Sequence, residues 1–140
     1  MLILLMNRNV PLSESDIKDI KQIKRVKFGK EFNQSLDNLP DGVIEIEFVR
    51  DSIFNQKLDN LPQSLKILIL NNSFNQPLDF LPNNLEKLYI CYNYSNSLLN
   101  LPTGLKSIGF TNKSFNTHYS KSIIEYINLV KDKVDFYDSY

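Results

Sequence analysis

The sequence predicts an α/β repeat fold rich in β-structure. We expect a short solenoid with one parallel sheet of five or six strands, a loop-rich back face and a C-terminal capping helix. Three markers support this prediction: an aromatic residue, a Leu-Pro pair and an apolar triplet, each recurring every 20 to 22 residues. Self-similarity at a fixed period of this length is typical of solenoids, in which each repeat stacks on the next.

The aromatic residue and the Leu-Pro pair define the repeats. Successive aromatic residues lie 22, 20, 20 and 21 residues apart, and successive Leu-Pro pairs lie 22, 20 and 20 apart. Because two independent markers keep one period, chance does not explain the agreement. The aromatic residues are Phe32, Phe54, Phe74, Tyr94 and Phe115, and the Leu-Pro pairs begin at Leu39, Leu61, Leu81 and Leu101.

The apolar triplet is spaced as L-x-x-L-x-L and predicts one strand in each repeat. Its last two members share one face of a strand, because a single residue separates them. One strand per repeat cannot form tight hairpins, so each strand must pair in parallel with its equivalent in the next repeat. Pro, Asn and Asp between the strands predict turns or short 3₁₀ segments. The triplets are Ile23/Val26/Phe28, Val43/Ile46/Phe48, Leu65/Leu68/Leu70, Leu85/Leu88/Ile90 and Leu105/Ile108/Phe110.

The segments between the strands predict the interior of the coil. We expect the aromatic residues to stack on each other, and the following Asn residues to form a row that satisfies backbone carbonyls. The second repeat has two extra residues near Ser52-Ile53, which predict a bulge in its turn. The Asn residues of the expected row are Asn33, Asn55, Asn75 and Asn116.

The two ends depart from the repeat. Residues 1–22 form an N-terminal cap or a degenerate repeat, with a first strand within 1–6 and a helix beginning at Ser13-Glu14-Ser15-Asp16. Residues 23–120 form five repeats, and residues 121–140 form a C-terminal capping helix and a loosely held tail. Either Ser120 or Ser122 can cap this helix. Its apolar face consists of Ile123, Ile127, Val130 and Val134.

Three units resemble the FNIP repeat, a leucine-rich-repeat-like family with about 22 residues in each unit. Each is followed by Leu-Pro and L-x-x-L-x-L, and the resemblance extends over residues 23–120. It implies a leucine-rich-repeat-like solenoid used for protein recognition, in proteins typical of amoebae and of the giant DNA viruses that infect them. The fourth unit has Tyr94-Ser95 in place of Phe-Asn, and Phe115-Asn116 lacks the following Leu-Pro. The three units are Phe32-Asn33-Gln34-Ser35-Leu36, Phe54-Asn55-Gln56-Lys57-Leu58 and Phe74-Asn75-Gln76-Pro77-Leu78.

The resemblance also implies a role in ubiquitylation. Many relatives carry an F-box-like segment before the repeats and are supposed to present targets for ubiquitylation. Here 22 residues precede the first full repeat. This is too short for an F-box helical module, so such a role would require a separate F-box protein.

The composition argues against several classes of protein. The formal net charge is zero, which gives no overall attraction to nucleic acid or membranes. The apolar start from Leu2 to Leu5 is too short for a signal peptide, and no apolar run approaches membrane-spanning length. Cys91 is the only cysteine, so no intrachain disulfide can form. We therefore expect a cytoplasmic protein, located in the host cytoplasm if it is viral.

No constellation of residues predicts catalysis or cofactor binding. Cys91 and His118 fall at different phases of the repeat, which argues against a nucleophile pair. The glycines form no phosphate-binding loop, and there is no Cys/His cluster for zinc and no EF-hand loop. Glu45 and Glu47 share one strand face, which we interpret as solvated. We expect no catalytic residue, no metal and no cofactor, and hence no enzyme.

A basic cluster near the N-terminus is the best candidate for nucleic-acid binding. It lacks interleaved aromatic residues, and acidic residues balance its charge elsewhere in the chain. We therefore interpret it as a solvated basic end and consider nucleic-acid binding the weaker alternative. The cluster comprises Lys18, Lys21, Lys24, Arg25, Lys27 and Lys30.

The outward-facing strand residues predict a partner-binding face. From strand to strand they are basic, acidic, apolar and then Lys with Tyr, ending in Ser107 and Gly109. Basic and acidic residues on neighbouring strands can form ion pairs. Exposed apolar side chains indicate a protein contact, whereas β-propensity or packing beneath the C-terminal segment would be a structural explanation. The predicted partner-binding residues are Arg25, Lys27, Glu45, Glu47, Ile67, Ile69, Lys87 and Tyr89.

The sequence thus predicts a non-enzymatic protein–protein interaction scaffold that binds a protein partner through the exposed face of the sheet. Two alternatives remain open. One is a structural or self-assembling repeat protein, whereas for the scaffold itself we expect a monomer or weak self-association. The other is the substrate-recognition part of a ubiquitin-ligase adaptor that lacks its own F-box.

Overall fold

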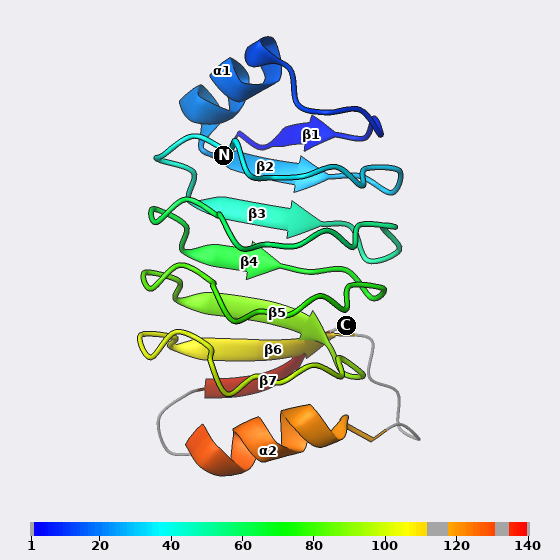
Figure 1. Ribbon diagram of the computed structural model, residues 1–140, viewed down its shortest axis with the longest axis vertical. Helices are drawn as coiled ribbons and strands as arrows, with labels where there is room; N and C mark the ends of the chain where they lie inside the picture. Colours follow the sequence, from blue (N-terminus) through cyan, green and yellow to red (C-terminus); the bar gives the residue numbers. More distant parts are fainter. Residues whose placement is uncertain (1, 112–117, 131–134, 140) are drawn as a thin grey trace.

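One parallel sheet runs along the molecule, and its strands follow each other in chain order (Figure 1). The computed structural model describes residues 2–111, 118–130 and 135–139. Helix α1 (Glu14–Ile23) follows the first strand, and helix α2 (Lys121–Val130) precedes the last. The predicted parallel solenoid with a loop-rich back face and a C-terminal helix is confirmed. The strands are β1 (Leu4–Met6), β2 (Arg25–Phe28), β3 (Glu45–Phe48), β4 (Ile67–Ile69), β5 (Lys87–Cys91), β6 (Ser107–Thr111) and β7 (Asp135–Ser139).

Strand β7 extends the sheet beyond the predicted strands. It pairs in parallel with β6, from Ser107 opposite Asp135 to Thr111 opposite Ser139. The sequence predicted a loosely held tail over residues 135–140, because chain ends are often poorly ordered. A parallel connection needs a crossover of a dozen or more residues, and the segment containing α2 supplies it. The tail therefore covers the edge of β6 that would otherwise be open.

The strands form because alternate residues enter a common core. Strands β2 and β3 alternate half-buried and buried side chains, and Ile46 lies opposite Val26 on one side and Leu68 on the other. The equivalent inward residues of the later strands are also buried. In the first triplet, however, Ile23 ends α1 and is only half-buried. The fully buried residue of that helix is Ile20.

The predicted aromatic stack is present inside the coil. Ring centroids of Phe32 and Phe54 lie 6.3 Å apart, those of Phe54 and Phe74 6.1 Å, and those of Phe74 and Tyr94 6.5 Å. Phe54 also stacks on Phe48 of β3 with centroids 4.0 Å apart. Tyr94 fits the stack because its hydroxyl donates to the Gln76 carbonyl at 2.7 Å. Burial raises the pKa of the Tyr94 hydroxyl, and the nearby Asp79 carboxylate acts in the same direction. Phe115 and Asn116 lie outside the described residues.

The predicted Asn row also forms, but its hydrogen bonds differ from those expected. The side-chain oxygen of Asn33 accepts the backbone N–H of Asn55 at 3.0 Å, and that of Asn55 accepts the N–H of Asn75 at 3.0 Å. Each Asn therefore mainly satisfies a backbone donor of the next repeat, whereas we expected it to satisfy carbonyls. Asn9 begins the row by accepting the N–H of Asn33 at 3.1 Å.

The longer second turn is filled by a residue from the next repeat. Asn71 is buried, and its Nδ2 donates to the carbonyls of Ser52 and Phe54 at 2.8 and 3.1 Å. Ser52 is buried as well, and its hydroxyl accepts the N–H of Phe54 at 3.1 Å. The two extra residues thus form a bulge that Asn71 holds in place.

Each helix is capped by a serine. Ser13 and Asp16 form a reciprocal capping box at the start of α1, as the sequence predicted. The Ser120 hydroxyl accepts the N–H of Ile123 at 3.3 Å and donates to the Tyr94 carbonyl, so Ser120 rather than Ser122 caps α2. No helix among the described residues is both long enough and apolar enough to span a membrane.

Candidate protein-interaction face

The outward side chains of β2 to β6 lie in two parallel rows, which we call the outer face. Strand register fixes both rows, because each residue lies opposite its equivalent on the next strand. The fold therefore brings all the predicted partner-binding residues together on one side of the sheet. One row is Arg25, Glu45, Ile67, Lys87 and Ser107, and the other is Lys27, Glu47, Ile69, Tyr89 and Gly109.

Ion pairs occupy the β2–β3 part of the outer face. Lys27 Nζ lies 3.0 Å from Glu47 Oε1, and Arg25 Nε lies 3.8 Å from Glu45 Oε2. The predicted cross-strand pairing is confirmed. Such half-exposed pairs contribute about 0.2–1 kcal/mol each to stability. The pairs account for these four charged residues, so no protein partner is needed to explain them.

An apolar patch follows on β4 and β5. Ile67 lies between Glu45 and Lys87, and Ile69 lies between Glu47 and Tyr89. Ile67, Ile69 and Tyr89 are half-buried by their neighbours, whereas Lys87 is exposed. The patch consists of two branched aliphatic side chains and an aromatic ring, with ion pairs on one side and an ammonium group on the other.

The solvent-accessible part of the outer face ends at β5. Ser107 and Gly109 occupy outward positions, yet both are buried. Their side chains are small, and they pair with residues of β5 on one side and of β7 on the other. Within the described residues, Ser107 Oγ has no hydrogen-bond partner. The outward residues open to a partner therefore lie on β2 to β5.

A small recess borders the apolar patch, which sequence reasoning did not predict. It has a volume of about 130 Å³, and Glu47, Ile69 and Asn72 contribute to its walls. The Asn72 side-chain oxygen is buried without a hydrogen-bond partner among the described residues. The sequence feature that could have indicated this recess is the longer second turn, because Arg50 from that turn also lines it.

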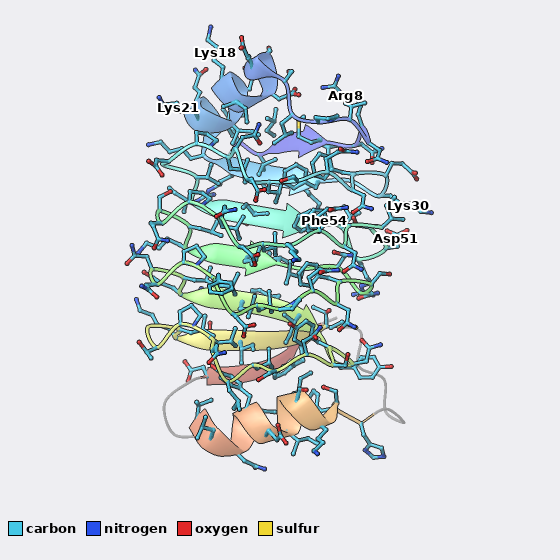
Figure 2. The ribbon with its side chains drawn as sticks, viewed as in Figure 1. Arg8, Lys18, Lys21, Lys30, Asp51 and Phe54 are labelled. Carbon is cyan, nitrogen blue, oxygen red and sulfur yellow. The ribbon has the colours of Figure 1, made fainter. Side chains whose placement is uncertain are left out.

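The basic cluster does not form one surface. Lys18 and Lys21 project from α1 on one side of the molecule, whereas Lys30 lies on the opposite side near Asp51 (Figure 2). Arg25 and Lys27 are engaged with glutamates on the outer face. This separation weakens the nucleic-acid alternative, because a backbone-tracking site needs its cations side by side.

The residues considered for catalysis are not arranged as an active site. Cys91 is buried at the end of β5, and His118 is exposed in the segment before α2. Glu45 and Glu47 are engaged in ion pairs. In the described ranges, no group of three or more His, Cys, Asp or Glu side chains could hold a metal ion.

Comparison with known proteins supports the repeat assignment. A family model described as FNIP Repeat matches residues 54–93, which span the second aromatic residue to the turn after β5. Searches of curated proteins and of solved structures gave no match. The matched region contains the stacked residues Phe54 and Phe74 and the apolar patch of the outer face. The architecture is that of a repeat scaffold, and the chain contains FNIP repeats over residues 54–93.

Proposed function

We propose that the protein is a non-enzymatic interaction scaffold that binds a protein partner through the outer face. The apolar patch of Ile67, Ile69 and Tyr89 is the observation that carries this proposal. Strand β7 continues the sheet beside β6, so residues 135–139 do not provide the covering segment considered as a structural explanation for the patch. Apolar and aromatic side chains at the centre of a rigid surface are typical anchors of protein contacts.

The surroundings of the patch indicate the chemistry of the partner. Lys87 borders both Ile67 and Tyr89, and it makes no ion pair with another described residue. A carboxylate of the partner would complement Lys87 at the rim, while an apolar side chain would cover Ile67 and Ile69.

Substitution of the patch tests this proposal. The double variant Ile67→Asp/Tyr89→Asp places charge at the centre of the surface and should abolish capture of the partner from native-cell lysate, quantified by mass spectrometry. Ile53→Asp is the matched control, because Ile53 is 45% exposed but lies in the second turn away from this face. Circular dichroism should show that both variants fold. Retention of every captured partner by the double variant would count against the outer face.

Self-assembly is a second candidate, favoured by the exposed edge of β1. Leu5 on this strand is 64% exposed, and the preceding Leu2 is 76% exposed. Strand β1 pairs only with β2 among the described strands, so no described strand occupies its other edge. Sedimentation across a concentration series should then show association in the wild type that Leu5→Lys reduces. A monomeric wild type at every concentration would exclude this candidate.

A further inference from the structure

A polar ladder runs along the turns that precede the Leu-Pro pairs. Asn60 Nδ2 donates to Asp37 Oδ1 at 3.2 Å, and Asn100 Nδ2 donates to Asp79 Oδ1 at 3.0 Å. In both cases, the Asn immediately before Leu-Pro reaches the Asp of the preceding repeat. The ladder therefore links equivalent turns of successive repeats.

Two residues interrupt this ladder in neighbouring repeats. Phe80 occupies the position of Asn60 and Asn100, and Leu99 occupies that of Asp37, Asp59 and Asp79. The Phe80 side chain is 67% exposed and that of Leu99 is 55% exposed. The repeat does not require either residue, because polar residues fill the equivalent positions of the other turns. Large apolar side chains grouped on a surface indicate a contact.

One of the two exposed residues, Leu99, borders a groove at the C-terminal end of the solenoid. The hydrogen bond from Asn100 to Asp79 holds their two turns together, so Phe80 and Leu99 lie on adjacent turns. Leu99 lines this groove of about 250 Å³ together with Leu129 of α2, which is 64% exposed. Other apolar residues complete its walls: Leu101, Pro102, Leu105, Tyr126 and Val130.

Carboxylates border this apolar surface. Asp79 precedes Phe80 in the chain, and Asp59 occupies the equivalent position one repeat earlier. Because Phe80 has no amide group, it cannot give Asp59 the hydrogen bond that Asp37 and Asp79 receive from the following repeat. Within the described residues, neither Asp59 nor Asp79 makes an ion pair. The nearest cation in the sequence, Lys57, is exposed.

We propose that Phe80, Leu99 and the groove beside Leu129 form a second docking surface, for a short peptide segment of a protein partner. The segment carries a large apolar side chain that packs against Leu99 and the groove. It also carries a Lys or Arg whose charge complements Asp59 and Asp79. This surface lies on the turns between the strands and is separate from the outer face, so the two proposals stand independently.

Selection of displayed random peptides on the immobilised full chain tests this surface. We expect enriched peptides to combine a large apolar residue with Lys or Arg. Phe80→Asn and Leu99→Asp restore the residues of the ladder, so these variants should fold, as urea unfolding will verify. Synthetic copies of the enriched peptides should bind each variant about tenfold or more weakly in fluorescence anisotropy, because buried anchors dominate such contacts.

Two further variants test the role of the Asp59 charge and the location of the peptide-binding surface separately. Asp59→Asn should lower the affinity for the peptides, because it removes one carboxylate that attracts their Lys or Arg. It should also reduce the salt dependence of binding, since salt screens such attractions. Ile67→Asp/Tyr89→Asp on the outer face should leave peptide affinity unchanged. The proposal is overturned if no peptide is enriched, if the enriched peptides lack basic residues, or if they bind Phe80→Asn and Leu99→Asp as tightly as the wild type.

Discussion

Asn71 shows how one side chain holds a turn that departs in length from its neighbours. It is 1% exposed, and its single amide nitrogen serves the carbonyls of both Ser52 and Phe54. These carbonyls lie in an irregular segment where no helix or sheet partner is available. A buried polar group left without a hydrogen bond costs about 1–3 kcal/mol.

Asn71→Ala should therefore lower the free energy of unfolding by about 2–4 kcal/mol, because two buried carbonyls lose their donor together. Urea denaturation measures this change. Asn83→Ala is the control, since Asn83 is exposed, and its effect should stay within about 0.5 kcal/mol. Equal midpoints for the two variants would show that the second turn does not depend on Asn71.

Asp16 makes the stability of the start of α1 depend on pH. Its carboxylate accepts the N–H of Ser13 at 2.8 Å and lies 3.1 Å from Arg8 Nη2. The Ser13 backbone hydrogen bond is the main cause that lowers the pKa of Asp16 below its ordinary value of 3.8, with help from the Ser13 hydroxyl and Arg8, while burial opposes them. A carboxyl whose pKa is lower in the folded state stabilises the fold when it is ionised.

This contribution should be present near neutral pH and disappear as the pH falls below 3.8 and through the lowered folded-state pKa. Asp16→Asn should be less stable than the wild type at pH 7, and the difference should shrink in acid. Urea midpoints from pH 7 down to strongly acidic buffer measure it. Asp41→Asn is the control, because Asp41 is exposed in a turn outside the helix. A wild-type advantage that persists unchanged in acid would contradict this role.

At the residue scale, the sequence could predict contacts that repeat or are local. The capping box of Ser13 and Asp16 lies within one helical turn, and the outward positions of Ile67 and Tyr89 follow from strand alternation. Asn71 could not be predicted, because its partners lie 17 and 19 residues earlier in a turn of unusual length. The recess beside Ile69 depends on the same turn.

At the scale of elements, the aromatic column is the main internal support of the turns. Phe74 is 3% exposed and stacks between Phe54 and Tyr94 with nearly parallel rings, at interplanar angles of 7° and 8°. The aromatic column replaces the hydrophobic packing that a helix would supply on the back of a sheet. Loss of one ring leaves a cavity that the neighbours, fixed by their own repeats, cannot close.

Phe74→Ala should destabilise the protein by about 3–5 kcal/mol, the usual range for removing a buried phenylalanine. The urea midpoint measures the change. Phe80→Ala provides a matched control in the same repeat, because Phe80 is 67% exposed and leaves no cavity when it is truncated. An unchanged midpoint for Phe74→Ala would refute the structural role of the stack.

The sequence could predict the strands in the part of the chain where the repeat markers recur, but not the last strand, where the markers are absent. Strands β2 to β6 follow from the triplets, whereas Ile23 fits the first triplet in sequence but ends helix α1. Strand β7 carries no marker, and its pairing with β6 depends on the crossover through α2. The Asn row was located correctly, but the direction of its hydrogen bonds depends on turn geometry that spacing does not specify.

At the scale of the whole molecule, each strand pairs only with the strands next to it in the chain, so stability is propagated from neighbour to neighbour (Figure 1). Ile20 in the N-terminal cap and Leu68 in central β4 are both fully buried, with 0% exposure. Truncating either side chain to Ala should lower the free energy of unfolding by a similar amount, about 2–5 kcal/mol. Their positions along the solenoid should nevertheless give different patterns of local opening, because an end can fray without disturbing distant repeats.

Hydrogen exchange followed by mass spectrometry should resolve these patterns. In Ile20→Ala, the loss of amide protection should be largest in β1 and β2 and should decline toward β6, since α1 packs against those first strands. In Leu68→Ala, the loss should be largest in β3 to β5 and extend in both directions, because central β4 joins the two halves of the sheet. Equal loss of protection in every strand of Ile20→Ala would instead mean that the chain opens as one cooperative unit. The outer face would then unfold together with its ends, and changes to the N-terminal cap would weaken partner binding at β4 and β5.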